Sequence, residues 1–144
     1  MISGERSVEL NAPAEQVWQV VSNVEAGAEW QASLKSVTVL ERDAQGRASL
    51  VEELADAKIK TIRAVLRYTY GPGVVSWVQE KGDAKSVVGS WKLDDLGAGR
   101  TRATFAIETD LGRVLGMVLR PVEDKVVDVL AGGAVNDLKA HVER

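Results

Sequence analysis

Glu52 and Glu53 are adjacent carboxylates in a stretch that otherwise reads as a β-strand. Neighbouring residues of a strand point to opposite faces, so one of the two is expected to face inward. A carboxyl in apolar surroundings has a raised pKa and can serve as an acid or a base. The sequence leaves open which of the two glutamates this is.

Tyr68 and Tyr70 fall on the apolar face of another predicted strand. A buried tyrosine hydroxyl needs a hydrogen-bonding partner. Both hydroxyls could orient a carbonyl or hydroxyl of a ligand, or they could pair with the backbone or water at the strand end. Arg63 and Arg67 share the opposite face, so we expect them to be solvated cross-strand charges.

Other kinds of catalytic site have little support. The chain has no cysteine and one histidine, His141, which excludes thiolate chemistry and, in practice, a histidine-based metal site. No Gly-x-Ser-x-Gly motif supports a serine nucleophile, and Gly97-Ala98-Gly99 precedes a strand rather than the helix of a dinucleotide loop. We therefore assign no catalytic residue, no metal and no cofactor, and leave open whether the protein is an enzyme.

The composition is that of an ordinary globular domain. The 144 residues are 45% hydrophobic and 27% charged, which predicts one domain spanning residues 1–144. The net charge of -3 argues against general nucleic-acid binding and gives no overall attraction to anionic membranes. No apolar run reaches the ~20 residues of a membrane span, and the N-terminus lacks the apolar segment of a signal peptide. We expect a cytoplasmic monomer or homodimer without stable membrane insertion.

The residues discussed above are predicted to lie on one β-sheet, which the following strands and short helices build. Ile2–Leu10 alternates as a half-buried strand, Pro13–Ser22 has the pattern of a short helix with Pro13 at its first position, and Glu25–Trp30 suggests a second short helix or turn. From residue 34 to 110 the hydrophobic period is two, and short turns force antiparallel neighbours. The six predicted strands are Leu34–Asp43, Arg47–Leu54, Lys58–Tyr70, Val74–Glu80, Lys85–Leu93 and Thr101–Asp110. With the first strand they make a seven-stranded sheet with one apolar face.

The C-terminal end supplies a cover for that face. Leu111–Arg120 is amphipathic, and about twenty residues of helical pattern run from Pro121 through Val142. A helix of that length spans ~30 Å, about the width of six strands. We expect the sheet to wrap around this helix and leave an apolar cavity. Gly132-Gly133 costs the helix about 2 kcal/mol relative to alanine, and marks either a tight contact or bend, or room for a ligand.

Several short sequence segments, in their order along the chain, also resemble those of a known family. They are the run from Val8 to Trp18 (VELNAPAEQVW), Glu29-Trp30, Val75-Ser76-Trp77, Gly89-Ser90-Trp91-Lys92-Leu93 and Asp110-Leu111-Gly112. Together they resemble the polyketide cyclase/dehydrase-like branch of the START and birch-pollen-allergen (SRPBCC) superfamily, over essentially the whole chain. The resemblance implies an α+β helix-grip fold with a deep cavity between the sheet and the C-terminal helix. Members bind lipids, sterols, polyketides or other hydrophobic molecules, and some catalyse cyclisation or dehydration.

We therefore predict that the protein binds a small hydrophobic ligand in this cavity. The alternatives are a cyclase or dehydratase acting on a polyketide-like substrate, and a protein–protein module whose cavity is only a packing defect. We expect core packing as the main role of the four tryptophans, Trp18 above all, and the alternative is that Trp77 and Trp91 line a pocket together with Phe105. The residues predicted to line the cavity are Trp30, Ile62, Leu66, Tyr68, Trp77, Trp91, Phe105, Met117, Val122, Val126 and Leu130.

Overall fold

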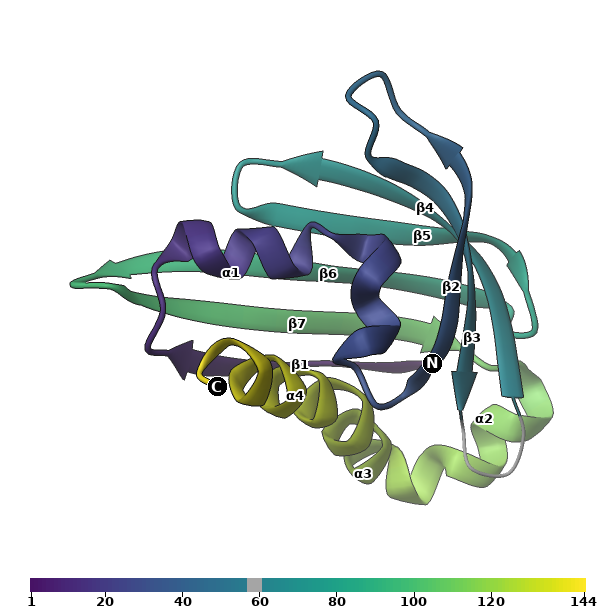
Figure 1. Ribbon diagram of the computed structural model, residues 1–144. Helices are drawn as coiled ribbons and strands as arrows, with labels where there is room; N and C mark the ends of the chain where they lie inside the picture. Colours follow the sequence, from purple (N-terminus) through teal and green to yellow (C-terminus); the bar gives the residue numbers. More distant parts are fainter. Residues whose placement is uncertain (57–60) are drawn as a thin grey trace.

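A single antiparallel sheet organises the computed structural model, which describes residues 1–56 and 61–144 (Figure 1). Its seven strands follow the order β1-β7-β6-β5-β4-β3-β2, so the predicted α+β fold with a seven-stranded sheet is confirmed. Residues 57–60, which hold the predicted start of the Lys58–Tyr70 strand and part of the turn before it, lie outside the described residues. The strands are β1 (Ile2–Leu10), β2 (Leu34–Arg42), β3 (Ala48–Asp56), β4 (Thr61–Gly71), β5 (Val74–Gly82), β6 (Ser86–Gly97) and β7 (Arg100–Asp110).

The outer face of the sheet carries the cross-strand charges. Arg63 pairs with Glu52 at 2.5 Å, and Arg67 with Glu80 at 2.8 Å and Glu41 at 3.1 Å. All these side chains keep substantial solvent exposure, so water and salt screen the pairs and each contributes little to stability. The outward orientation predicted for Arg63 and Arg67 is therefore confirmed.

The inner face carries the large apolar side chains. Directly paired residues share a face, and the pairs are Tyr68 with Trp77, Val75 with Trp91, and Trp91 with Phe105. All five are buried. The aromatic residues of four strands therefore form one continuous surface on this side of the sheet.

Two short helical segments close one end of the sheet. They are α1 (Ala14–Val21) and the 3₁₀ segment η1 (Val24–Glu29), which the Pro13–Ser22 and Glu25–Trp30 patterns predicted to within a few residues. Pro13 is extended and stands just before α1 rather than inside it. Thr101 of β7 is fully buried and donates a hydrogen bond to the Ala12 carbonyl at 2.8 Å, which ties the start of α1 to the sheet.

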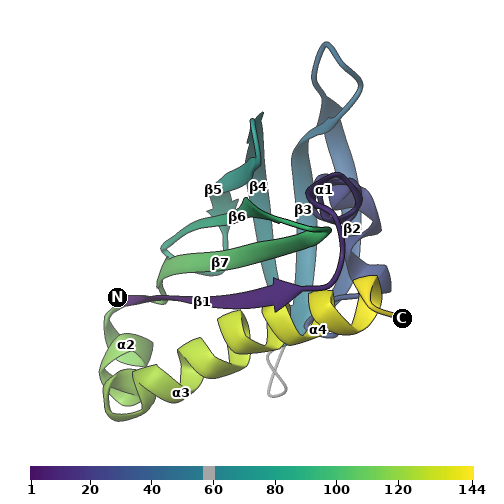
Figure 2. The ribbon, with the colours of Figure 1, turned by 90° about the vertical axis from the view of Figure 1, so that its left-hand side faces the viewer.

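The C-terminal helical region runs along the β1 side of the sheet (Figure 2). It consists of α2 (Arg113–Leu119), a 3₁₀ turn η2 (Arg120–Val122), α3 (Glu123–Val127), a π turn η3 (Asp128–Gly132) and α4 (Gly133–Val142). The long helix predicted from Pro121 is therefore present over residues 123–142 with one π turn inside it, and the 3₁₀ turn at its start separates it from α2. Pro121 lies in the 3₁₀ turn because it has no N–H for an α-helical bond, and the π turn ends at the glycine pair.

Close packing holds this region against β1. A Cβ on Gly4 would stand 2.6 Å from Val127, so only glycine lets the helix approach this closely. Arg6 reaches over the same strand to Asp128 at 2.5 Å. Val127, Ala131 and Leu138 are buried at this contact. The helix therefore lies on the sheet along a stripe that begins at Val126–Val127, not at Val122, which is 39% exposed.

Candidate functional site

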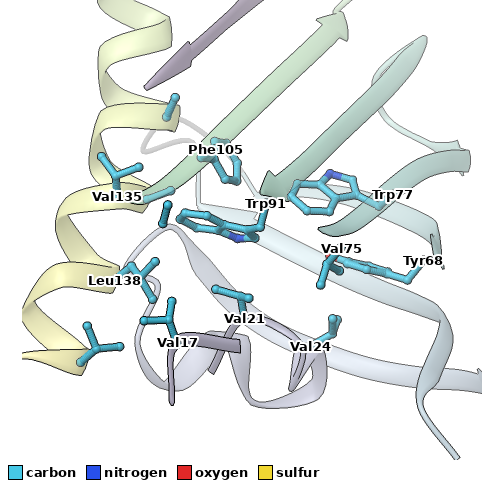
Figure 3. Close-up of a cluster of buried hydrophobic side chains, with 14 of the residues drawn as sticks. Val17, Val21, Val24, Tyr68, Val75, Trp77, Trp91, Phe105, Val135 and Leu138 are labelled. Atoms are coloured by element: carbon cyan, nitrogen blue, oxygen red, sulfur yellow. The ribbon is translucent and has the colours of Figure 1, made fainter. Parts of the chain in front are cut away.

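A row of aromatic rings crosses the inner face of the sheet (Figure 3). Ring centroids are 5.4 Å apart for Tyr68 and Trp77, 5.7 Å for Trp77 and Phe105, and 4.9 Å for Phe105 and Trp91. Trp30, at the end of η1, extends the row with its ring 6.0 Å from that of Trp91. These tilted and edge-on contacts are the favoured geometries of aromatic pairs.

Gly89 makes room for this row. Trp77 comes from β5 and Phe105 from β7, so the indole must lie across the intervening strand β6. Gly89 is the β6 residue paired with Trp77, and a Cβ there would overlap the indole ring. A glycine at this position is therefore a requirement of the aromatic row.

A buried carboxyl stands at one end of the row. Glu53 pairs with Ala64 on the inner face, and its Oε2 accepts a hydrogen bond from the Tyr68 hydroxyl at 2.6 Å. Burial raises the pKa of Glu53, and the hydrogen bond from Tyr68 opposes that rise only in part. The pKa of Tyr68 is raised well above its ordinary value by burial and by the neighbouring Glu53. Glu53 is thus the inward glutamate that the sequence left unassigned.

Tyr70 has a different environment. Its hydroxyl donates to the Ala48 carbonyl at 2.6 Å, and the Arg47 guanidinium lies 4.6 Å from its ring centroid. Burial raises the pKa of Tyr70 to about 12. This hydroxyl pairs with the backbone, as one of the two predicted alternatives had it, and its role is structural.

Trp30 connects the sheet to the C-terminal helix. Its ring stacks on His141 of α4 with centroids 6.1 Å apart, and Asp137 accepts a hydrogen bond from the Ala32 N–H at 3.0 Å. The Trp30 Nε1 is buried without an acceptor among the described residues. An orphaned buried N–H costs free energy, so the Trp30 indole is an unsatisfied donor of the described structure.

The predicted lining residues occupy three kinds of position. Leu66, Tyr68, Trp77, Trp91 and Phe105 are buried together in the main cluster. Trp30 and Val126 pack against that cluster and keep partial exposure. Ile62 and Leu130 are also partly exposed. Met117 is 64% exposed and Val122 39%, and neither belongs to the cluster. A ligand-binding role for any of them stays a prediction.

Part of the inner face is incompletely covered. Four small or aliphatic inner-face side chains keep partial solvent exposure although they point to the helix side: Ala55, Ala64, Val87 and Ile107. None of the four was predicted as a lining residue, although the alternation of the sequence placed Ala64 and Ile107 on the apolar face. It also missed Gln79, whose Nε2 donates to the Ala84 carbonyl while its buried Oε1 has no partner in the described structure.

Two kinds of feature are absent from the described residues. Residues 1–56 and 61–144 contain no group of three or more metal-ligating side chains placed to hold an ion. Within the same ranges, no helix is long and apolar enough to cross a membrane.

Comparison with known proteins agrees with this architecture. The family model described as "Polyketide cyclase / dehydrase and lipid transport" matches residues 10–132. The chain belongs to this family. The sequence resemblance to the polyketide cyclase/dehydrase-like branch is thereby confirmed. No curated protein matches the chain.

Solved structures share the fold at low sequence identity. A START superfamily protein from Mycobacterium smegmatis has a TM-score of 0.80 at 20% identity, with 99% of this chain and 98% of that chain covered. The Zhui aromatase/cyclase from Streptomyces sp. R1128 has a TM-score of 0.81 at 22% identity, with 99% and 93% covered. A protein from Thermus thermophilus has a TM-score of 0.84 at 18% identity, with 97% and 96% covered. These likenesses establish the helix-grip fold.

Proposed function

We propose that the protein binds a flat, apolar molecule with a polar group on the inner face of the sheet. The observation that carries the proposal is the Glu53–Tyr68 pair, which lies at the end of the aromatic row. Aromatic side chains supply apolar area at low entropic cost, and a few fixed polar groups orient a ligand in such sites. The exposed inner-face residues, Ala64 and Ile107 among them, give a ligand apolar surface to cover.

The polar groups suggest what the ligand carries. A protonated Glu53 can donate a hydrogen bond to a carbonyl, and an ionised one can accept from a hydroxyl. Trp30 Nε1 offers a donor at the far end of the row. The groups therefore suit an aromatic or polycyclic molecule with oxygen substituents at two edges.

Titration with 1-naphthol, and with 1-methoxynaphthalene as the matched compound without a hydroxyl, tests this by calorimetry. We expect Glu53→Gln to change the affinity for 1-naphthol and to leave that for 1-methoxynaphthalene unchanged. Glu52→Gln is the control, because that carboxylate faces outward and pairs with Arg63. Binding of neither compound, together with no retained metabolite in native mass spectrometry of protein from its own host, would overturn the proposal.

A second candidate function is proton transfer on the same ligand. The raised pKa of Glu53 specifically favours it, because a carboxyl that titrates closer to neutral pH exchanges protons efficiently. In the dehydration of a β-hydroxy ketone, Glu53 as carboxylate would take a proton from the carbon next to the ketone, and the electrons of that C–H bond would form the new C=C bond as the hydroxyl departs. The resulting acid would return that proton to the departing hydroxyl, which leaves as water. If Glu53→Gln still binds the ligand but no longer converts it to product, the protein is an enzyme and not a carrier.

A further inference from the structure

The helix α2 presents an apolar face to solvent. Val114 is 78% exposed, Val118 67% and Met117 64%. Leu119 packs against the core, so one side of the helix is fixed to the domain while the other is uncovered. Figures 1 and 2 place α2 at a corner of the molecule, where a broad surface could reach it.

A cationic pocket adjoins this apolar face. The pocket has a volume of about 490 Å³, and its lining includes Lys85, Arg113 and Arg120 beside Met117. The one acid in the lining is Asp110, whose Oδ1 already accepts a hydrogen bond from the Gly112 N–H at 2.9 Å. The local charge is therefore positive, in a protein with a net charge of -3.

The two arginines of this pocket differ from most arginines of the chain. Seven arginines pair with carboxylates within 4 Å, at positions 6, 42, 47, 63, 67, 100 and 102. In the described part of the chain, Arg113, Arg120 and Arg144 have no such partner, and Lys85 has none either. The two arginines beside α2 are therefore left without the carboxylate that most other arginines have.

We propose that α2 docks the protein reversibly on an anionic lipid surface. Val114, Met117 and Val118 would enter the boundary between headgroups and acyl chains, and the three cations would lie among lipid phosphates. Helices with one apolar side and flanking Lys or Arg bind membranes in this way, and each cation near the surface strengthens the binding. The overall negative charge opposes this weakly, because salt screens charges beyond ~8 Å.

Two features disfavour a protein as the occupant. A second copy related by a two-fold axis would bring Arg113 and Arg120 of both chains together without compensating acids. The exposed face of α2 has no tryptophan or tyrosine, the residues that anchor most protein interfaces. Aliphatic side chains on a projecting helix suit shallow insertion into lipid better.

Co-sedimentation with vesicles tests the proposal directly. The protein is mixed with phosphatidylcholine vesicles, or with vesicles that also hold about 30 mol% phosphatidylglycerol. We expect at least about tenfold stronger partitioning to the anionic vesicles, which falls as salt is added. Arg113→Gln/Arg120→Gln and Val114→Ser/Val118→Ser should each lower that partitioning about tenfold. Circular dichroism and thermal melts establish that every variant is folded.

Matched controls lie on other faces. Val78, 53% exposed on β5, replaced by Ser, and Arg100 replaced by Gln should sediment like the unaltered protein. Three results would overturn the proposal. One is equal sedimentation of Val114→Ser/Val118→Ser and the unaltered protein. Another is a dimer at micromolar concentration that this double variant dissociates, which would identify a second copy. The last is binding of inorganic phosphate at the pocket with no vesicle binding. None of these results bears on the 1-naphthol titration, so this proposal and the proposed function fail separately.

Discussion

Tyr68 donates a hydrogen bond of 2.6 Å to Glu53, and the two side chains come from adjacent strands on the covered face of the sheet. Glu53 has no cationic partner among the described residues, unlike Glu52, which pairs with Arg63 on the other face. Burying a carboxyl without a counter-charge favours its protonated form. The pair therefore couples the stability of the fold to pH.

The first prediction concerns that coupling. The folded protein holds the Glu53 proton to higher pH than the unfolded chain does, so Glu53 lowers the free energy of unfolding as pH rises above its ordinary pKa of 4.5. Glu53→Gln removes this loss. Its free energy of unfolding relative to the unaltered protein should grow as the pH rises above 4.5, and should level off above the folded-state pKa of Glu53, as measured by urea unfolding at a series of pH values.

Glu52→Gln is the control for this experiment. It loses an exposed ion pair with Arg63, which contributes at most about 1 kcal/mol. The difference in free energy of unfolding between Glu52→Gln and the unaltered protein should not rise with pH in the same way. A parallel trend in both variants would mean that Glu53 is not the group responsible.

Tyr68→Phe should be destabilising. It removes the donor to the Glu53 carboxyl and leaves a buried polar group short of a partner, at a cost of about 1–3 kcal/mol. That hydrogen bond lowers the pKa of Glu53. Its loss should therefore move the pH range over which the free energy of unfolding falls to higher pH. Urea unfolding of Tyr68→Phe, Glu53→Gln and the double variant should give a coupling energy above about 0.5 kcal/mol. Tyr70→Phe loses only a bond to a backbone carbonyl, so it should add independently to Glu53→Gln.

The sheet could be predicted from the sequence. Which residues of β3 face inward could not. Alternation fixed the inward side of β4, where Leu66 and Tyr68 alternate with Arg67 and Thr69. In β3, the runs Leu50-Val51 and Leu54-Ala55 place apolar residues on both faces, so periodicity cannot say which glutamate is inside. Pairing with β4 decides it, because Glu53 lies opposite Ala64.

The helical region shows a different limit. Its apolar spacing predicted a helix that lies on the sheet, and the cost of Gly132-Gly133 signalled an irregularity. The structure shows that this irregularity is the π turn Asp128–Gly132. It directly follows Val127, which packs against Gly4. The exposed face of α2 was not predicted either, because an amphipathic pattern does not say whether its apolar side is covered.

Gly89→Ala should disrupt the aromatic row. The added methyl would overlap the Trp77 indole, which must move away from Phe105. Overpacking of this kind costs about 1–3 kcal/mol. Gly116→Ala is the matched control, since its Cβ would meet open space inside α2 and should be neutral or stabilise by up to about 1 kcal/mol. Equal thermal stability of the two variants would show that Trp77 does not depend on Gly89.

Gly133→Ala should separate stability from binding. Gly133 has a helical φ of -61°, and no atom lies within 4 Å of where its Cβ would stand, so the tight contact considered from sequence is absent. Alanine should therefore raise the free energy of unfolding by about 0.5–1 kcal/mol.

If the open space beside Gly133 serves the ligand, the same change should weaken 1-naphthol binding. Asn136→Ala, on the exposed side of α4, should stabilise the helix without affecting binding. Tighter binding in Gly133→Ala would contradict a role for this space in accommodating the ligand.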